Sequence, residues 1–249
     1  MSSDNSVRSI GRAIDLLALF DHRHPFLALR DIVELSGLPK TTVVRLLANL
    51  EQRSLISTRA DGSYTLGAGF LRWVRMSSSL WDVNESTRQC MRRLAEECGE
   101  TVNIYVRQDL ARVSISQHEG AATVRNVIEV GKPMPLWAGA SAKVLLADAP
   151  EIIEAVASGP DGVDAATLRE QVAEVKEAGY ALSHGEREFG ATSVSAPIVA
   201  GDGRVLAALS VSGPTSRFTT ERLEAILPAV TTAAKEISGV GLGSVEALL

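Results

Sequence analysis

Three short amphipathic stretches followed by a hairpin signal constrain the fold of this chain more than any other feature. Apolar residues recur at helical spacing in segments 8–21, 29–36 and 40–53. The run Gly37-Leu38-Pro39 makes a tight bend before the third segment, and proline suits a helix start. Asp61-Gly62 then favours a tight turn between two short alternating runs. This order predicts a winged helix-turn-helix over residues 1–66.

The third helical segment has two chemically different faces. One face is apolar and carries Val43, Leu46, Leu47 and Leu50. Between Lys40 and Leu50 there are two cations and no acid. A major groove favours such a face, because DNA phosphates repel carboxylates and because arginine and short polar side chains reach base edges. If this helix is considered by itself, its polar face is explained equally well as the solvent-exposed side of a small helical core. The preceding bend and the wing favour DNA binding.

The predicted DNA contacts divide into two kinds. Lys40, Arg53 and Arg59 are expected on phosphates, whereas Thr41, Thr42 and Arg45 are expected on bases. The full predicted set is Arg30, Pro39, Lys40, Thr41, Thr42, Arg45, Asn49, Arg53 and Arg59. The charge distribution along the chain agrees with DNA binding by the N-terminal part. Residues 1–79 hold ten Arg/Lys against seven Asp/Glu, and the remaining chain holds fifteen against twenty-three.

The rest of the 249-residue chain is long enough for a second domain. Helical spacing over 67–81 predicts a linker helix, and residues 82–249 form the predicted second domain. Its pattern predicts a helix from Asp82 to Gly99. Apolar and polar residues then alternate in 101–108, 111–120 and 123–131, which predicts three strands. Helices follow in 139–149, 151–158 and 165–179, strands in 180–185, 192–200 and 205–213, and a last helix in 219–238. The fold class expected is α+β with two domains, the second an antiparallel sheet flanked by helices.

Motifs for catalysis, metals or phosphate loops are absent from the sequence. We therefore expect no catalytic residues, no metal and no cofactor. A serine-dependent enzyme remains an alternative, with His118 and His184 as weak candidate bases. A non-specific nucleoid protein is another, although it leaves the acidic second half unexplained. No apolar run is long enough to span a membrane, and Cys90 and Cys98 are spaced too far apart on a helix for a disulfide, so a cytoplasmic protein is expected.

A row of serines marks the predicted second domain. Ser183, Ser193, Ser195, Ser210 and Ser212 fall on three predicted neighbouring strands, where residues two apart share a face. One interpretation is an exposed outer face. The other is a pocket lined by hydroxyl groups and closed by the backbone N–H groups around Ala140–Lys143, which favour an anion or a carbonyl oxygen.

The sequence resembles the IclR-type transcriptional regulators of bacteria over essentially its whole length. The residues that carry this resemblance are "GLPKTTVVRLLANLE" (37–51), "YTLGAGFL" (64–71), "VGKPMPLWAGASAKVLLA" (130–147) and "GYALSHGEREFGATSVSAPI" with "VLAALSVSGP" (179–214). The resemblance implies a winged helix-turn-helix, a GAF-like or PAS-like effector domain and no enzymatic activity. It also implies homodimers, often paired into tetramers, that bind double-stranded palindromic operators. We expect a repressor.

The resemblance also implies an effector site. Ala140 and Ser141 match residues whose backbone amides meet the effector, and four serines match pocket-lining positions. Members that sense small keto acids carry an acid and a cysteine at Ser183 and Ser193, and a histidine at Trp137. These departures favour a larger effector, whether aromatic, amide-bearing or related to amino acids. The predicted effector residues are Tyr105, Trp137, Ala140, Ser141, Ser183, Ser193, Ser210 and Ser212.

Overall fold

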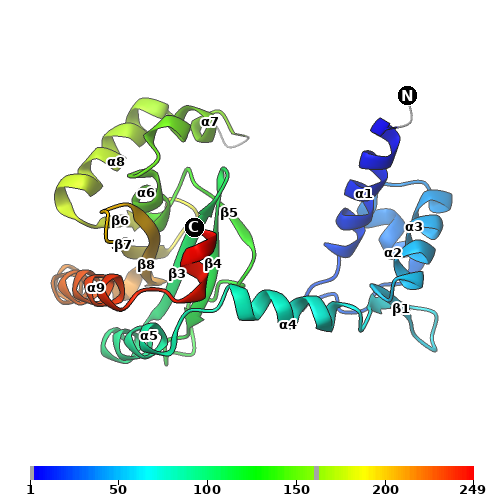
Figure 1. Cartoon of the computed structure of the whole chain (residues 1–249), viewed down its shortest axis with the longest axis horizontal. Coiled ribbons are helices and arrows are strands. Elements are labelled where there is room, and N and C mark those ends of the chain that lie inside the picture. The colour runs from blue at the N-terminus through cyan, green and yellow to red at the C-terminus, as the bar shows by residue number, and fades with distance from the viewer. Residues whose placement is uncertain (1–2, 160–162) are drawn as a thin grey trace. The chain divides into compact units, whose positions relative to one another are not determined.

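The computed structural model describes residues 3–159 and 163–249, which form two compact units. The first unit comprises Met1–Ser79 and the second Leu80–Leu249 (Figure 1). Each unit has its own hydrophobic core, so each is described by itself. No helix of the described residues is both long and apolar enough to cross a membrane.

The first unit is the winged helix-turn-helix that the sequence predicts. It contains α1 (Ser3–Leu17), α2 (Leu29–Ser36), α3 (Lys40–Gln52), the antiparallel strands β1 (Ile56–Thr58) and β2 (Tyr64–Leu66), and α4 (Phe70–Leu80), whose last residue opens the second unit. Its core gathers the apolar sides of α1, α2 and α3, with Leu16, Ile32 and Leu47 at most 1% exposed. Gly37 ends α2 in the left-handed region at φ 64°, which glycine adopts without strain and which allows the tight bend into α3.

The second unit is built on one six-stranded antiparallel sheet with the order β5-β4-β3-β8-β7-β6. Its strands are β3 (Thr101–Gln108), β4 (Ala111–His118), β5 (Pro133–Pro135), β6 (Ala181–His184), β7 (Ala191–Val199) and β8 (Val205–Pro214). The central strands β3 and β8 pair with each other although about a hundred residues of chain separate them. The centre of the sheet therefore joins two parts of the domain that are far apart in the sequence.

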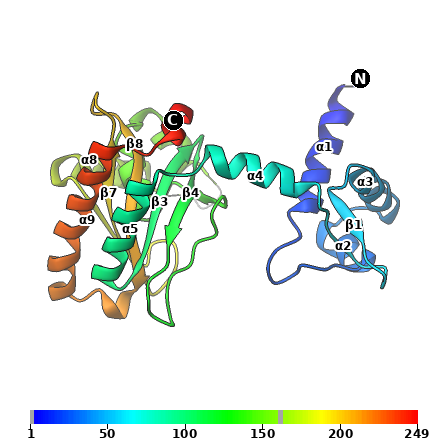
Figure 2. The same ribbon diagram turned by 60° about the horizontal axis from the view of Figure 1, so that its bottom comes forward.

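Helices cover both faces of this sheet. α5 (Glu85–Cys98) and α9 (Thr220–Val240) pack on one face, and their apolar sides form the larger core cluster with the sheet. α6 (Ala140–Leu146), α7 (Ile153–Ala157) and α8 (Ala165–Ala178) form the second cluster (Figures 1 and 2). Tyr105 and Ala208 belong to this second cluster, whereas their strand neighbours Ile104 and Leu209 belong to the first. This alternation separates the two faces as strand geometry requires.

Two sequence predictions are wrong, one in each unit. Residues 123–131 form a loop, because the free edge of β4 pairs instead with the short strand β5. The loop is held by side chains: Asn126 donates to Ser212 Oγ at 3.0 Å, and Gln117 Oε1 accepts from the Ile128 N–H at 2.8 Å. The first helix also ends at Leu17 rather than near Asp21, whose carboxylate instead accepts from the backbone of a turn.

Candidate functional site

The face of α3 opposite its core side is fully presented to solvent. Lys40, Thr41, Arg45 and Asn49 are exposed and Thr42 is half-buried, while Val43 and Leu47 close the core. Pro39 precedes the helix, and its carbonyl accepts from the N–H of Thr42 at 2.8 Å. The described residues place no acid within ion-pair distance of Lys40 or Arg45. This face therefore carries uncompensated positive charge.

Arg45, Asn49 and Arg53 form a row along one edge of α3. The Asn49 amide donates to the Arg45 carbonyl at 2.8 Å, and Arg53 Nη1 donates to the Asn49 carbonyl at 3.1 Å. All three residues line a groove whose other wall is the apolar side of α1, where Ile10 and Ile14 are 61% and 59% exposed. Arg53 thus bonds its own helix, whereas the Arg45 guanidinium has no hydrogen-bond partner within the described part of the chain.

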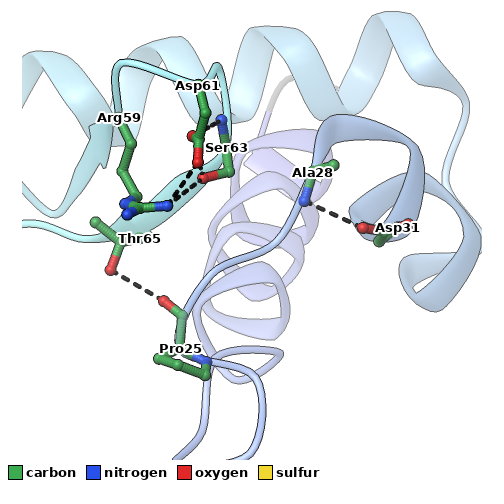
Figure 3. A network of polar contacts seen from close by, with 7 residues as sticks. All are labelled: Pro25, Ala28, Asp31, Arg59, Asp61, Ser63 and Thr65. Carbon is green, nitrogen blue, oxygen red and sulfur yellow. Dashed lines mark hydrogen bonds and ion pairs between the residues drawn. The ribbon is translucent and has the colours of Figure 1, made fainter.

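Arg59, which is expected to contact a phosphate, is paired within the wing. Asp61 Oδ2 accepts from Arg59 Nη1 at 2.7 Å, and its Oδ1 accepts from the Ser63 N–H at 2.9 Å and hydroxyl at 2.6 Å (Figure 3). The guanidinium also lies 4.0 Å from the centre of the Phe26 ring. The turn thus has its own counter-ion, which offsets the charge that Arg59 offers to a phosphate.

Arg30 is likewise paired, although its side chain is 89% exposed. Its Nε lies 3.1 Å from Asp31 Oδ1. The other oxygen, Asp31 Oδ2, accepts from the Ala28 N–H at 3.2 Å at the start of α2 (Figure 3). An exposed pair of this kind is weak and can exchange for another partner. All nine predicted DNA-binding residues lie in the first unit, and among the described residues Lys40, Arg45 and Arg53 have no acidic partner.

A pocket opens on the α6 side of the sheet in the second unit. It holds about 440 Å³ of space, part of which is open to solvent. Six of the eight predicted effector residues line it, namely Tyr105, Ser141, Ser183, Ser193, Ser210 and Ser212. The loop that replaces the predicted strand contributes Asn126 and Ile128. Ala140 is instead buried in the second core cluster, and Trp137, which is half-buried, packs against that cluster.

Strand register explains why the serines meet. Ser193 pairs directly with both Ser183 and Ser212 on its neighbouring strands, and Ser195 pairs with Ser210. Paired residues in an antiparallel sheet project to the same face, so the hydroxyl groups form one polar surface. All of these except Ser193 are at most 5% exposed. The interpretation of an exposed outer face is therefore wrong.

Arg112, which the sequence did not single out, is the buried cation of this pocket. It is 3% exposed on β4, and its Nη1 donates to the carbonyls of Pro135 at 2.6 Å and Ala138 at 2.5 Å. Burial lowers the pKa of its guanidinium to about 10, which leaves it charged at neutral pH. Burial raises the pKa of the adjacent Tyr105 phenol to about 12, so that group stays protonated.

A second charged cluster stands beside α6. Glu186, from the segment between β6 and β7, accepts from Lys143 Nζ at 2.5 Å with one oxygen and from the Gly139 N–H at 2.9 Å with the other. The Lys143 side chain is 7% exposed and that of Glu186 is 28% exposed. The N–H of Gly139, next to the N–H groups around Ala140–Lys143 that are expected to face an anion, thus already meets a carboxylate of the chain itself.

The arrangement offers little to a serine-dependent enzyme. His184 Nδ1 lies 3.0 Å from Thr192 Oγ1 rather than beside a serine hydroxyl. The described residues contain no group of three histidine, cysteine, aspartate or glutamate side chains that could hold a metal ion. What the pocket does offer is hydrogen bonds from hydroxyl groups and one buried positive charge, which suit reversible binding of a small polar molecule.

Two family models match this chain. The model described as "IclR helix-turn-helix domain" matches residues 9–60, and "Bacterial transcriptional regulator IclR C-terminal" matches residues 77–239. Together they cover both units, so the chain belongs to the IclR family. It is a DNA-binding transcriptional regulator with an effector-binding C-terminal domain, as the sequence resemblance implied, and its family consists of regulators rather than enzymes.

The comparison with individual proteins agrees. The chain is 33% identical over 244 residues to the HTH-type transcriptional regulator KipR of Bacillus subtilis, covering 94% of this chain and 97% of KipR. Several other curated relatives are named repressors. A solved IclR-family structure from Rhodococcus sp. is 49% identical, with 98% of each chain covered and a TM-score of 0.66. An IclR homologue from Microbacterium hydrocarbonoxydans, solved in complex with 4-hydroxybenzoate, is 25% identical, with 96% and 99% covered and a TM-score of 0.74.

Proposed function

We propose that the protein is a repressor that binds a palindromic operator and leaves it when a small organic metabolite occupies the pocket. The observation that carries this proposal is the exposed, acid-free face of α3 with its free Lys40 and Arg45. The repressor names of several relatives support the sign of regulation. Because its partner is chromosomal DNA, we place the protein in the cytoplasm.

At the operator, α3 is the recognition helix. Thr41, Thr42 and Arg45 lie toward its N-terminal half, the part that reaches base edges when such a helix enters a major groove. Lys40 and Arg53 contact phosphates on either side. Arg59 contributes less than its charge suggests, because Asp61 already neutralises it.

The active species is a homodimer or a dimer of dimers. A palindromic operator requires two recognition helices related by a two-fold axis. Exposed apolar side chains in the first unit offer a surface for a second copy, since large exposed apolar patches mark protein contacts. They are Ile10 and Ile14 of α1, and Leu71, Trp73, Val74 and Met76 of α4.

The effector acts by population shift between two arrangements of the recognition helices. The hydroxyl lining of the pocket suits a small polar metabolite, and we expect one that is aromatic, amide-bearing or related to an amino acid. A relative of the same fold holds 4-hydroxybenzoate, which supports a small organic ligand. Ligand binding and DNA binding are then coupled reciprocally.

Fluorescence anisotropy with promoter DNA from beside its own gene tests the proposal. Arg45→Ala is expected to weaken operator binding about 5- to 150-fold, equivalent to ~1–3 kcal/mol, and random DNA far less. Arg107→Ala, the same charge change on an exposed residue of β3, is the control and should leave operator binding nearly unchanged. Equal affinity of the wild-type protein for operator and random DNA would reject specific regulation.

A further inference from the structure

The cations in and beside the pocket, Arg112, Arg187 and Lys143, outnumber the carboxylates of Glu186 and Glu188 by one. Lys143 is paired with Glu186 at 2.5 Å, and Arg187 with Glu188 at 3.3 Å. Arg112 is the cation left over: within the described parts of the chain no carboxylate forms an ion pair with it. We propose that the pocket takes a ligand with one carboxylate group and that Arg112 is the residue that binds this group. The inference rests on the effector role proposed above for the same pocket.

The surroundings of Arg112 make it a binding group rather than only a structural one. Its two hydrogen bonds go to neutral backbone carbonyls, and the Glu186 carboxylate, which attracts Arg112 electrostatically, forms its ion pair with Lys143 instead. Its Nε is buried and has no hydrogen-bond partner among the described residues, although Arg112 lines the pocket. A buried guanidinium in this condition is costly, and a carboxylate is the partner that fits its planar donor geometry best.

The rest of the pocket specifies where the neutral part of such a ligand lies. The ring of Tyr105, with its centre 5.7 Å from the Arg112 guanidinium carbon, offers an apolar face. The hydroxyl groups of Ser183, Ser193 and Ser210 offer donors and acceptors for a polar substituent. A carboxylate at one end and a polar substituent at the other therefore match the lining. An amide in place of the carboxylate would leave the charge of Arg112 unpaired.

The carboxylate of Glu186 is expected to lower the affinity of this site for a ligand anion. Its carboxylate shares the pocket with the ligand anion and repels it, while it neutralises Lys143. Glu186→Gln removes the repulsion and leaves a second buried cation without its counter-ion. The variant is therefore expected to bind a carboxylate ligand more tightly, at least about tenfold, and to bind the matching amide no better.

Isothermal titration calorimetry of the full chain, without DNA, tests the inference with two matched probe pairs: acetate with acetamide, and 4-hydroxybenzoate with 4-hydroxybenzamide. At least one acid is expected to bind at least about tenfold more tightly than its amide. An amide that binds as well as its acid, or no heat from either acid, would overturn the proposal. Inorganic phosphate that competes as strongly as the acid would show a general anion site and would also overturn it.

Three variants separate binding from folding. Arg112→Gln is expected to lose the preference for the acid, and Arg112→Lys, which keeps the charge, to retain most of it. Arg107→Gln is the matched control, because Arg107 pairs with Arg112 across the two strands but is exposed. If Arg112→Gln does not fold, the Arg112→Lys and Glu186→Gln affinities decide, and an unchanged affinity in Glu186→Gln counts against the proposal. Since no DNA is present, a failure of operator binding leaves this result unaffected.

Discussion

The ion pair between Glu100 and Arg217 is expected to be the most costly polar interaction to break in the second unit. Glu100 is 2% exposed just before β3, and Arg217 approaches it from the turn after β8. Arg217 Nε donates to one carboxylate oxygen at 2.5 Å and Nη2 to the other at 2.6 Å, which is the bidentate geometry. The same Nη2 donates to the Val124 carbonyl at 3.0 Å, so the pair also holds the loop that lines the pocket.

The two partners should not be equivalent when they are removed. Arg217→Met leaves the Glu100 carboxylate buried without a counter-ion, for which losses of 3–5 kcal/mol are typical. Because the Arg217 side chain is 34% exposed, we expect the lower end, about 3 kcal/mol. Glu100→Gln leaves an arginine that can turn toward solvent, so we expect about 1–2 kcal/mol.

Urea unfolding in a Trp73→Phe background measures this difference. The remaining tryptophans, Trp81 and Trp137, both lie in the second unit and report on it alone. A loss of about 3 kcal/mol lowers the midpoint by about 1–2 M urea for the usual slopes. Arg204→Met is the control, since its pair with Asp202 is exposed and 3.8 Å long, and its midpoint should stay nearly unchanged.

Two outcomes would refute this reasoning. One is a loss in Arg217→Met no larger than in the Arg204→Met control, which would mean that the buried pair contributes nothing net. The other is an equal loss in Arg217→Met and Glu100→Gln, which would contradict the argument from burial. Hydrogen exchange offers a second measurement, because Arg217→Met should also speed exchange in the loop around Val124, whose carbonyl loses its donor.

Three further predictions follow from local contacts. Gly139→Ala should destabilise the fold by about 1–3 kcal/mol in a thermal scan, because φ is 96° and an added Cβ would lie 3.0 Å from Arg112 Nη2. Asn84→Ala should cost about 1–2 kcal/mol in the same scan, because Asn84 caps α5 and donates to the Gly241 carbonyl at 2.7 Å. Burial raises the pKa of the Cys98 thiol from about 9 to about 11, so the folded state holds that proton longer than the unfolded state. Stability should therefore fall by about 2 kcal/mol from pH 9 to 11, and in Cys98→Ala this part of the fall should vanish.

Local signals in the sequence sufficed for much of the fold. The bend at Gly37 and the helical spacing of the first unit depend on neighbours within a few residues, so they could be predicted without knowing the partner elements. The shared face of the serines could also be predicted, because a strand places residues two apart on one side. That this face is buried depends on α6 and the loop at 123–131, which only the structure places there.

The strand predicted at 123–131 shows where such signals fail. The segment alternates as a strand does, but alternation describes a side-chain pattern and not the presence of a hydrogen-bonding partner. β4 has one free edge, and Pro133–Pro135 occupies it although two of its three residues are prolines. An edge strand tolerates proline because one side of its backbone needs no ladder partner. Which of two segments pairs with the free edge of a strand depends on the tertiary structure, which a local sequence pattern does not describe.

Charge compensation was the other property that sequence could not provide. Counting cations in the first unit gives Arg59 and Lys40 the same weight, yet Asp61 neutralises the first and nothing described neutralises the second. In the pocket the reverse holds, because Arg112 lies in a chain with excess acid and still forms no ion pair with a carboxylate of the described residues. A partner anion is attracted by the charge that remains after internal pairing, so the unpaired cations of α3 and the guanidinium of Arg112 on β4 are both expected to attract an external anion.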